Sequence, residues 1–288
     1  MAKVTVVVPS YNHEKYVLET LNSIKNQTFT DFNVIIIDDA SKDKTAEIIE
    51  SFLKENELNW TFIKRENNKG LVYNVNEAFN LSQSEYISLI ASDDFWAPTK
   101  LEKQVKVLEE DDSIAMVFND YYDMDENSQV FNTVIRNKRY YTYHDIASGK
   151  DLPPASLIFR KNKLTHNFSD IEKLCVEDLF IWLSCLSDKK SKAYVLDETL
   201  SYYRLHRNNT AKRIPIKLLD QHYITLKYFQ KPKNEFTDKY CAAWALRNFN
   251  ALSRHYKRES LYYLKRSLIL FYKFNFWVAL GKLILLWF

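Results

Sequence analysis

Residues 86–98 read Tyr-Ile-Ser-Leu-Ile-Ala-Ser-Asp-Asp-Phe-Trp-Ala-Pro, and this stretch decides how the chain is interpreted. A run of strand-forming residues, 86–90, leads into two adjacent acids, Asp93 and Asp94, before Pro98 turns the chain. Loops at the carboxyl ends of parallel strands are where α/β sheets bind ligands, and carboxylate oxygens there suit Mg²⁺ or Mn²⁺ carrying a diphosphate. Taken alone, the pair is equally consistent with an Asx-type turn leading into a helix near Pro98.

Short apolar runs and helical patterns alternate through the first two-thirds of the chain. Strands are expected at 4–8, 34–37, 60–63 and 86–90, and helices at 14–26, 45–53, 73–81 and 100–109. This alternation predicts an α/β fold with a mostly parallel central sheet covered by helices on both faces. Later we expect short strands at 114–118, 155–160 and 193–196, a helix at 174–186, loop and hairpin structure at 121–143, and solvated loops around the acids of 120–126.

The last third of the chain differs, because no strand pattern follows residue 213. Helices are expected at 216–229, 236–255 and 260–271. We therefore expect an α/β domain over 1–212 and an all-helical C-terminal extension over 213–288.

The final stretch, 274–288, is almost entirely apolar. Its fifteen residues are fewer than the roughly 20 needed to cross a bilayer. From Arg254 onward the chain carries seven Lys and Arg residues against Glu259 alone, so this tail has a net charge of +6 on a body of −3. A basic, aromatic and apolar tail is typical of a helix lying in a membrane interface, and a helix packed on the core or on a second subunit is the alternative.

Composition argues against several classes of protein. Only three glycines occur, and neither GxGxxG nor GxxxxGK[ST] is present, so Rossmann dehydrogenases and P-loop NTPases have no support. The three cysteines show no CxxC spacing, which predicts reduced thiols. The N-terminus enters a strand without a leader, so we expect a cytoplasmic protein, peripheral at the inner face of the cell membrane. Nucleic acid is not an expected partner, because the tail charges alternate with long apolar runs.

Three acidic pairs lie at strand ends or at the start of a helix: Asp38-Asp39, Asp93-Asp94 and Glu177-Asp178. Four segments around them, in order and spacing, resemble the family 2 glycosyltransferases with a GT-A fold, including bacterial surface-polysaccharide enzymes. They are Val-Val-Val-Pro-Ser-Tyr-Asn-His-Glu-Lys-Tyr-Val (6–17), Ile-Ile-Ile-Asp-Asp-Ala-Ser-Lys-Asp-Lys-Thr (35–45), Asn-Asn-Lys-Gly-Leu (67–71) and Ser-Asp-Asp-Phe-Trp-Ala-Pro-Thr-Lys-Leu (92–101). The resemblance covers about residues 3–210 and implies a nucleotide-sugar-binding half at 1–110 and an acceptor half at 111–212.

The resemblance implies a nucleotide contact for five positions. Pro9, Tyr11 and Asn12 match the first-strand loop that packs against the base and ribose. Asp39 matches the acid that accepts a hydrogen bond from a uracil ring, and Asp93 would face the ribose.

The resemblance also implies a metal and diphosphate site. Asp94 would bind Mn²⁺ or Mg²⁺ directly. The family's metal motif often begins with an acid two residues before Asp93, and this chain has Ala91 there, so a leaner ligand set is implied. Arg204 and His206 match a segment that approaches the diphosphate, and His206 is a candidate for a further metal ligand.

The pair Glu177-Asp178 matches the family's acidic pair near the acceptor, with Asp178 as the catalytic base. An inverting transfer is one in-line displacement, and a carboxylate must take the proton of the attacking hydroxyl. The structural alternative for Asp178 is an acid that complements the dipole of a helix N-terminus.

We therefore expect an inverting glycosyltransferase of hexosyltransferase type that moves a single sugar from a nucleotide diphosphate sugar, with UDP as the nucleotide. No QxxRW pattern of processive synthases occurs. The expected acceptor is a hydroxyl of a glycan or lipid-linked molecule in surface polysaccharide synthesis, and the protein is a candidate homo-oligomer. A non-catalytic sugar-nucleotide-binding scaffold and a nucleotidyltransferase on a related fold are the alternatives.

Overall fold

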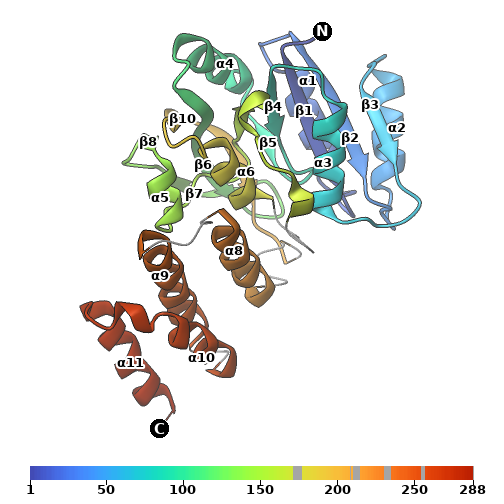
Figure 1. Cartoon of the computed structure of the whole chain (residues 1–288). Coiled ribbons are helices and arrows are strands. Elements are labelled where there is room, and N and C mark those ends of the chain that lie inside the picture. Colours follow the sequence, from blue (N-terminus) through green and yellow to red (C-terminus); the bar gives the residue numbers. More distant parts are fainter. Residues whose placement is uncertain (171–176, 208, 210–214, 230–234, 254–256, 288) are drawn as a thin grey trace.

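A sheet of ten strands forms the centre of the molecule (Figure 1). The computed structural model describes residues 1–170, 177–207, 209, 215–229, 235–253 and 257–287. The strand order is β3-β2-β1-β4-β9-β6-β10-β5, with β7 paired to β6 and β8 paired to β10. The strands are β1 Val4–Ser10, β2 Phe32–Asp38, β3 Thr61–Lys64, β4 Tyr86–Leu89, β5 Phe95–Trp96, β6 Ile114–Met124, β7 Val130–Val134, β8 Tyr140–Tyr141, β9 Ile158–Arg160 and β10 Lys192–Arg204.

The sheet is mostly parallel, as predicted. β1 pairs in parallel with β2 and β4, β2 with β3, and β6 with β10. β9 runs antiparallel to both β4 and β6, which makes those two strands parallel to each other. The carboxyl ends of β1, β2 and β4 therefore meet at one edge of the sheet.

Alternating side chains along β1 explain why helices cover both faces. Val6 and Val8 lie in a core cluster with residues of α1, α2 and α4, whereas Val7 lies on the opposite face with residues of α3 and α6. The helices of the α/β domain are α1 Val17–Lys25, α2 Thr45–Glu55, α3 Leu71–Leu81, α4 Lys100–Glu110, α5 Tyr143–Ala147 and α6 Asp178–Cys185, with 3-10 turns η1 Lys161–Lys163 and η2 Phe168–Asp170.

Two strands are longer than predicted. β6 and β10 pair along most of their length, so β6 continues to Met124 and β10 to Arg204. The prediction of solvated loops is wrong for Asp120, which lies in β6, is 2% exposed and forms an ion pair with Arg139 (2.8 Å). The short strand β5, which was not predicted, follows Asp93 and Asp94 directly in the sequence. It pairs antiparallel with the end of β10.

After residue 213, the described part of the chain contains helices and no strand, as predicted. They are α8 Pro215–Phe229, α9 Glu235–Leu252, α10 Lys257–Arg266 and α11 Phe274–Trp287, with a 3-10 turn, η3, at Leu268–Leu270. Leu226 and Trp244 share the core cluster of α6, and Trp244 Nε1 donates a hydrogen bond to the carbonyl of Ala147 (2.8 Å). The predicted boundary between 212 and 213 lies outside the described residues, as do residues 174–176 of the predicted helix.

Helices α9 to α11 form a further apolar cluster, separate from the two clusters that cover the faces of the sheet. Figure 1 shows these helices extending away from the sheet, with α11 and the chain end farthest from it. Within the described ranges, none of the helices combines the length and the apolar character that a membrane crossing requires.

Candidate functional site

The turn that carries Asp93 and Asp94 follows β4 and is fixed from three sides. The backbone N–H of Ser92 donates to the carbonyl of Pro9 in β1 (3.3 Å). The backbone N–H of Asp94 donates back to Ala91 (3.2 Å), and Thr20 Oγ1 of α1 donates to the Asp94 carbonyl (2.6 Å). Both acids are buried, with 7% and 3% of their surface exposed, so they are held rigidly.

Arg204, at the end of β10, encloses this turn. Its Nε donates to the carbonyl of Asp93 (2.7 Å), and its backbone N–H donates to Asp94 Oδ1 (2.8 Å). Its guanidinium, 1% exposed, forms an ion pair with Glu19 of α1 and donates from Nη1 to Ser128 Oγ (2.9 Å). A buried guanidinium with this many partners is a structural cross-link among α1, β4, β10 and the β6–β7 turn. The diphosphate contact that the sequence suggested for Arg204 stays a prediction.

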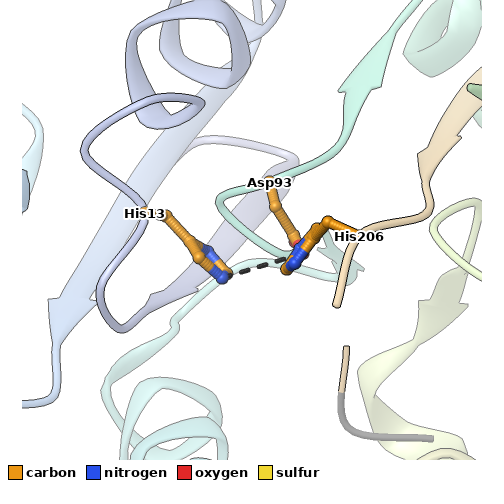
Figure 2. Close-up of side chains that lie close together, drawn as sticks. All are labelled: His13, Asp93 and His206. Carbon is orange, nitrogen blue, oxygen red and sulfur yellow. Dashed lines mark hydrogen bonds and ion pairs between the residues drawn. The ribbon is translucent and has the colours of Figure 1, made fainter. Parts of the chain in front are cut away.

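Asp93, His206 and His13 form a cluster (Figure 2). His206 Nε2 lies 2.9 Å from Asp93 Oδ2, and His13 Nε2 lies 3.7 Å from the same oxygen. One nitrogen or oxygen from each residue lies within 4.8 Å of the others. Tyr16 stacks on the His206 ring at 5.3 Å and thereby fixes its plane.

Burial and the histidines set the charges of the two acids. Burial acts to raise the pKa of Asp93, but the hydrogen bond from His206 acts in the opposite direction and prevails, so the pKa of Asp93 is lowered. Burial and the neighbouring Asp93 charge raise the pKa of Asp94 well above its usual range. Asp93 is thus the stably ionised member of the pair.

The cluster fits a divalent cation by the chemistry of its donor atoms. Ser92 donates its hydroxyl proton to Ser10 Oγ (2.9 Å), so the contact of His13 Nδ1 with Ser92 Oγ (2.8 Å) requires a proton on Nδ1. The lone pair of His13 Nε2 then faces Asp93, and a metal-binding histidine commonly donates its other N–H in this way. Imidazole nitrogen together with carboxylate oxygen suits Mn²⁺ better than Mg²⁺, which prefers oxygen.

Asp94, the metal ligand predicted from the sequence, lies outside this cluster. One of its oxygens accepts the Arg204 backbone N–H, and no described residue donates a hydrogen bond to the other. That second oxygen is therefore a further candidate ligand atom for a cation.

The first two loops at the sheet edge are tied together by the predicted nucleotide residues. Asn12, at φ 56°, accepts a hydrogen bond on Oδ1 from the Lys42 N–H (2.7 Å). Asp39 accepts hydrogen bonds from the backbone N–H groups of Lys69 (2.7 Å) and Gly70 (2.9 Å), which orders the 67–71 segment. Tyr11 is 36% exposed and Pro9 lies in β1 opposite Ile37.

A cavity of about 270 Å³ opens between the first of these loops and the segment that follows β10. It is lined by Asn12, Glu14, Lys15, Tyr16, Asp43, Glu126, His206 and Arg207. The cavity thus joins the predicted nucleotide residue Asn12 to His206 of the cluster, and its charges are mixed, with two basic residues and three acids.

Glu177 and Asp178 stand at the start of α6. Burial, with the charge of Asp178, raises the pKa of Glu177 to about 8. The Asp178 side chain touches solvent, yet the surrounding protein and the charge of Asp151 raise its pKa to about 6. At neutral pH the pair therefore carries one negative charge, on Asp178.

Tyr203 of β10 interacts electrostatically with both acidic pairs. Burial raises the pKa of its hydroxyl, and the charges of Asp94, Asp93 and Asp178 raise it further. All three carboxylates are therefore within electrostatic reach of one side chain.

Sequence reasoning missed His13, Glu19 and Tyr203. His13 was inside a quoted motif, but a histidine in a loop gives no sign of the partner it will face. Glu19 and Tyr203 act through contacts with residues more than 100 positions away, and no local pattern encodes those contacts.

Comparison with known proteins gives one family. A model described as Glycosyl transferase family 2 matches residues 5–167. An uncharacterized glycosyltransferase of Methanocaldococcus jannaschii is 33% identical over 239 residues, which are 81% of this chain and 81% of that protein. An Escherichia coli protein named UDP-Glc:alpha-D-GlcNAc-diphosphoundecaprenol beta-1,3-glucosyltransferase is 26% identical over 72% of this chain and 78% of its own length.

A solved structure matches the fold over nearly the whole chain. The crystal structure of S. aureus TarS 1–349 in complex with UDP-GlcNAc superposes with a TM-score of 0.71, covering 91% of this chain and 79% of that one. At 22% identity this likeness concerns the fold, and it confirms the predicted GT-A architecture.

We predict that Arg204→Met lowers the free energy of unfolding by about 3 kcal/mol, because several buried hydrogen bonds and an ion pair are lost. Urea unfolding followed by circular dichroism measures the change. The matched control is Arg207→Met, since Arg207 lies three residues further along the chain and its side chain is exposed. Unchanged stability with weakened UDP binding would contradict the cross-link and favour the diphosphate role.

Proposed function

This chain belongs to glycosyl transferase family 2, and we propose that it transfers one sugar from a UDP-sugar to a hydroxyl of a lipid-linked or glycan acceptor, with inversion at the anomeric carbon. That it is a glycosyltransferase follows from the family match and from the similar glycosyltransferases. The observation that best supports the rest is that Tyr203 interacts electrostatically with Asp93 and Asp94 as well as with Asp178.

The donor proposal rests on the edge where β1, β2 and β4 end. Asn12 and Asp39 there hold the two loops that the family uses for the nucleotide, beside the cavity at His206. A structural neighbour was solved with UDP-GlcNAc, and the E. coli relative is named for UDP-Glc, so both support UDP as the nucleotide. The nature of the sugar is not part of this proposal.

We propose Mn²⁺, with Mg²⁺ as the alternative, as the cofactor. Asp93, His206 and His13 would hold it, and the second oxygen of Asp94 is the further candidate ligand. When bound, such a cation neutralises negative charge on the diphosphate leaving group. His206 thereby combines the metal and diphosphate roles that its motif suggested.

In the proposed reaction, Asp178 accepts the proton of the acceptor hydroxyl while the hydroxyl oxygen bonds to the anomeric carbon. The bond from that carbon to the diphosphate oxygen breaks in the same step, and UDP leaves. A base is useful only if it is ionised, and Asp178 is the ionised member of its pair at neutral pH. Glu177, protonated beside it, keeps a second negative charge out of the site.

The acceptor and its place in the cell extend the proposal. The E. coli relative is named for a diphosphoundecaprenol-linked acceptor, which supports a lipid-linked acceptor in surface polysaccharide synthesis. We place the enzyme in the cytoplasm, peripheral at the membrane's inner face, with the basic C-terminal segment as its contact. Self-association of the chain is a separate question.

We predict that Asp178→Asn lowers the rate of sugar transfer by roughly 10²–10⁴-fold, the usual contribution of a general base. UDP affinity, measured by calorimetry, should stay within about twofold, because the amide removes the base without changing the donor loops. Asp31→Asn, an exposed acid far from the site, is the control. Full transfer by the Asn variant would contradict the mechanism.

The pH dependence of kcat/KM provides a second test. A pKa of about 6 for Asp178 predicts that activity falls as pH drops through 6, because protonation removes the base. Since the charge of Asp151 helps to raise this pKa, Asp151→Asn should move the acid limb to lower pH. An acid limb that does not move would mean that another group titrates there.

Metal binding by variants of the proposed ligands gives a third test. Calorimetry in the presence of UDP should find Mn²⁺ affinity weakened about tenfold or more by His206→Ala and by Asp93→Asn, because each substitution removes a ligand atom. The exposed His144→Ala is the control. Equal Mn²⁺ affinity in all four proteins would place the metal elsewhere.

A further inference from the structure

Helix α11 presents an apolar face without a partner in the described structure. Phe276 and Ala279 are buried against the rest of the helical extension. On the opposite side, at i, i+3, i+4 and i+11, four side chains are exposed: Phe274 (79%), Trp277 (56%), Val278 (40%) and Leu285 (82%). A helix that is apolar on all sides is normally buried on all sides, so this face indicates an occupant.

The exposed face continues into the segment before α11. Leu268, Ile269, Phe271 and Tyr272 are each at least 42% exposed. Elsewhere in the described chain, exposed apolar side chains are single, such as Leu18 on α1 and Leu81 on α3, or form smaller groups, such as Val130, Phe131 and Ile135 at β7. The four residues before α11 and the four exposed residues of α11 therefore form one concentrated patch, which we call the C-terminal apolar surface.

Basic side chains accompany this surface. Lys265, Arg266, Lys273 and Lys282 are all exposed, and no Asp or Glu follows Glu259 in the sequence. Arg266 lies over the Tyr262 ring, 3.3 Å from its centre, so its charge sits on an aromatic platform. Apolar aromatic residues flanked by Lys and Arg match the interfacial region of an anionic bilayer.

Charge also argues against a second copy as the occupant. A two-fold interface would set this surface against itself and bring the same basic residues together without an acid to pair them. Among the described helices, α11 included, none is long and apolar enough to cross a membrane.

We propose that the C-terminal apolar surface lies in the interface of a membrane containing anionic lipids, with Phe274, Trp277, Val278 and Leu285 inserted and the lysines at the headgroups. The helix axis then lies parallel to the membrane. This deepens the proposed function and rests on it for the lipid-linked acceptor, which the same membrane would present to the site.

Sedimentation of the full-length chain with lipid vesicles tests the proposal without donor or acceptor. Vesicles of phosphatidylcholine with phosphatidylglycerol should bind the chain, whereas phosphatidylcholine alone should bind it at least about tenfold more weakly, and added salt should reduce the difference. Equal binding to both, or binding to neither, overturns the proposal.

Variants separate the apolar and the electrostatic contributions to vesicle binding. Phe274→Ser with Trp277→Ser should lower binding to anionic vesicles about tenfold or more, and so should Lys273→Glu with Lys282→Glu. Leu18→Ser with Leu81→Ser, equally exposed apolar residues elsewhere, should bind like the parent, and circular dichroism checks that all three fold. Binding that survives in both C-terminal variants places the contact elsewhere.

Light scattering distinguishes a second copy. A dimer that is lost in the Phe274→Ser, Trp277→Ser variant, with no vesicle binding by the parent, would assign this surface to self-association and overturn the proposal. Donor hydrolysis measured in the absence of vesicles keeps the two hypotheses apart. If hydrolysis persists while vesicle binding fails, only the membrane proposal falls.

Discussion

The Arg204 guanidinium, buried beneath the Asp93–Asp94 turn, is the interaction on which the site depends. A charge with 1% exposure is tolerated only when its donors are paired, and its partners come from α1, from the turn after β4 and from the β6–β7 turn. The same residue ends β10, so satisfying the guanidinium also fixes where the chain leaves the sheet. His206, two residues later, is thereby positioned beside Asp93.

The site divides its charges between two places. The hydrogen bond from His206 favours ionised Asp93, and no residue in the described part of the chain donates a hydrogen bond to the second oxygen of the adjacent buried Asp94. Glu177, which is buried, has its pKa raised to about 8, and the neighbouring exposed Asp178 has its pKa raised to about 6, so the two acids differ in charge near neutral pH. Environments that separate the pKa values of neighbouring acids in this way allow one fold to give those acids different tasks. Binding of a charged donor and acceptance of a proton can then proceed side by side.

Sequence reasoning predicted what is local and missed what is distant. Continuous apolar runs predicted β1, β2 and β4, because strands buried on both faces need such runs. The extension of β10 to Arg204 was missed, because Tyr202, Tyr203 and Arg204 gain their strand conformation from pairing with β6. The acids Asp39, Asp93 and Asp178 were predicted from their motifs, whereas His13 became a candidate site residue only once the structure set its ring 3.7 Å from Asp93.

We propose that a rigid donor site, Asp178 as the base and a C-terminal surface in contact with a membrane act together in this enzyme. The central claim is that Asp178 takes the acceptor proton in a single displacement at the anomeric carbon. Proton NMR of the product formed from an α-linked UDP-sugar tests this claim most directly. The account predicts a β-configured product from the first turnover, and an α-configured product would contradict it.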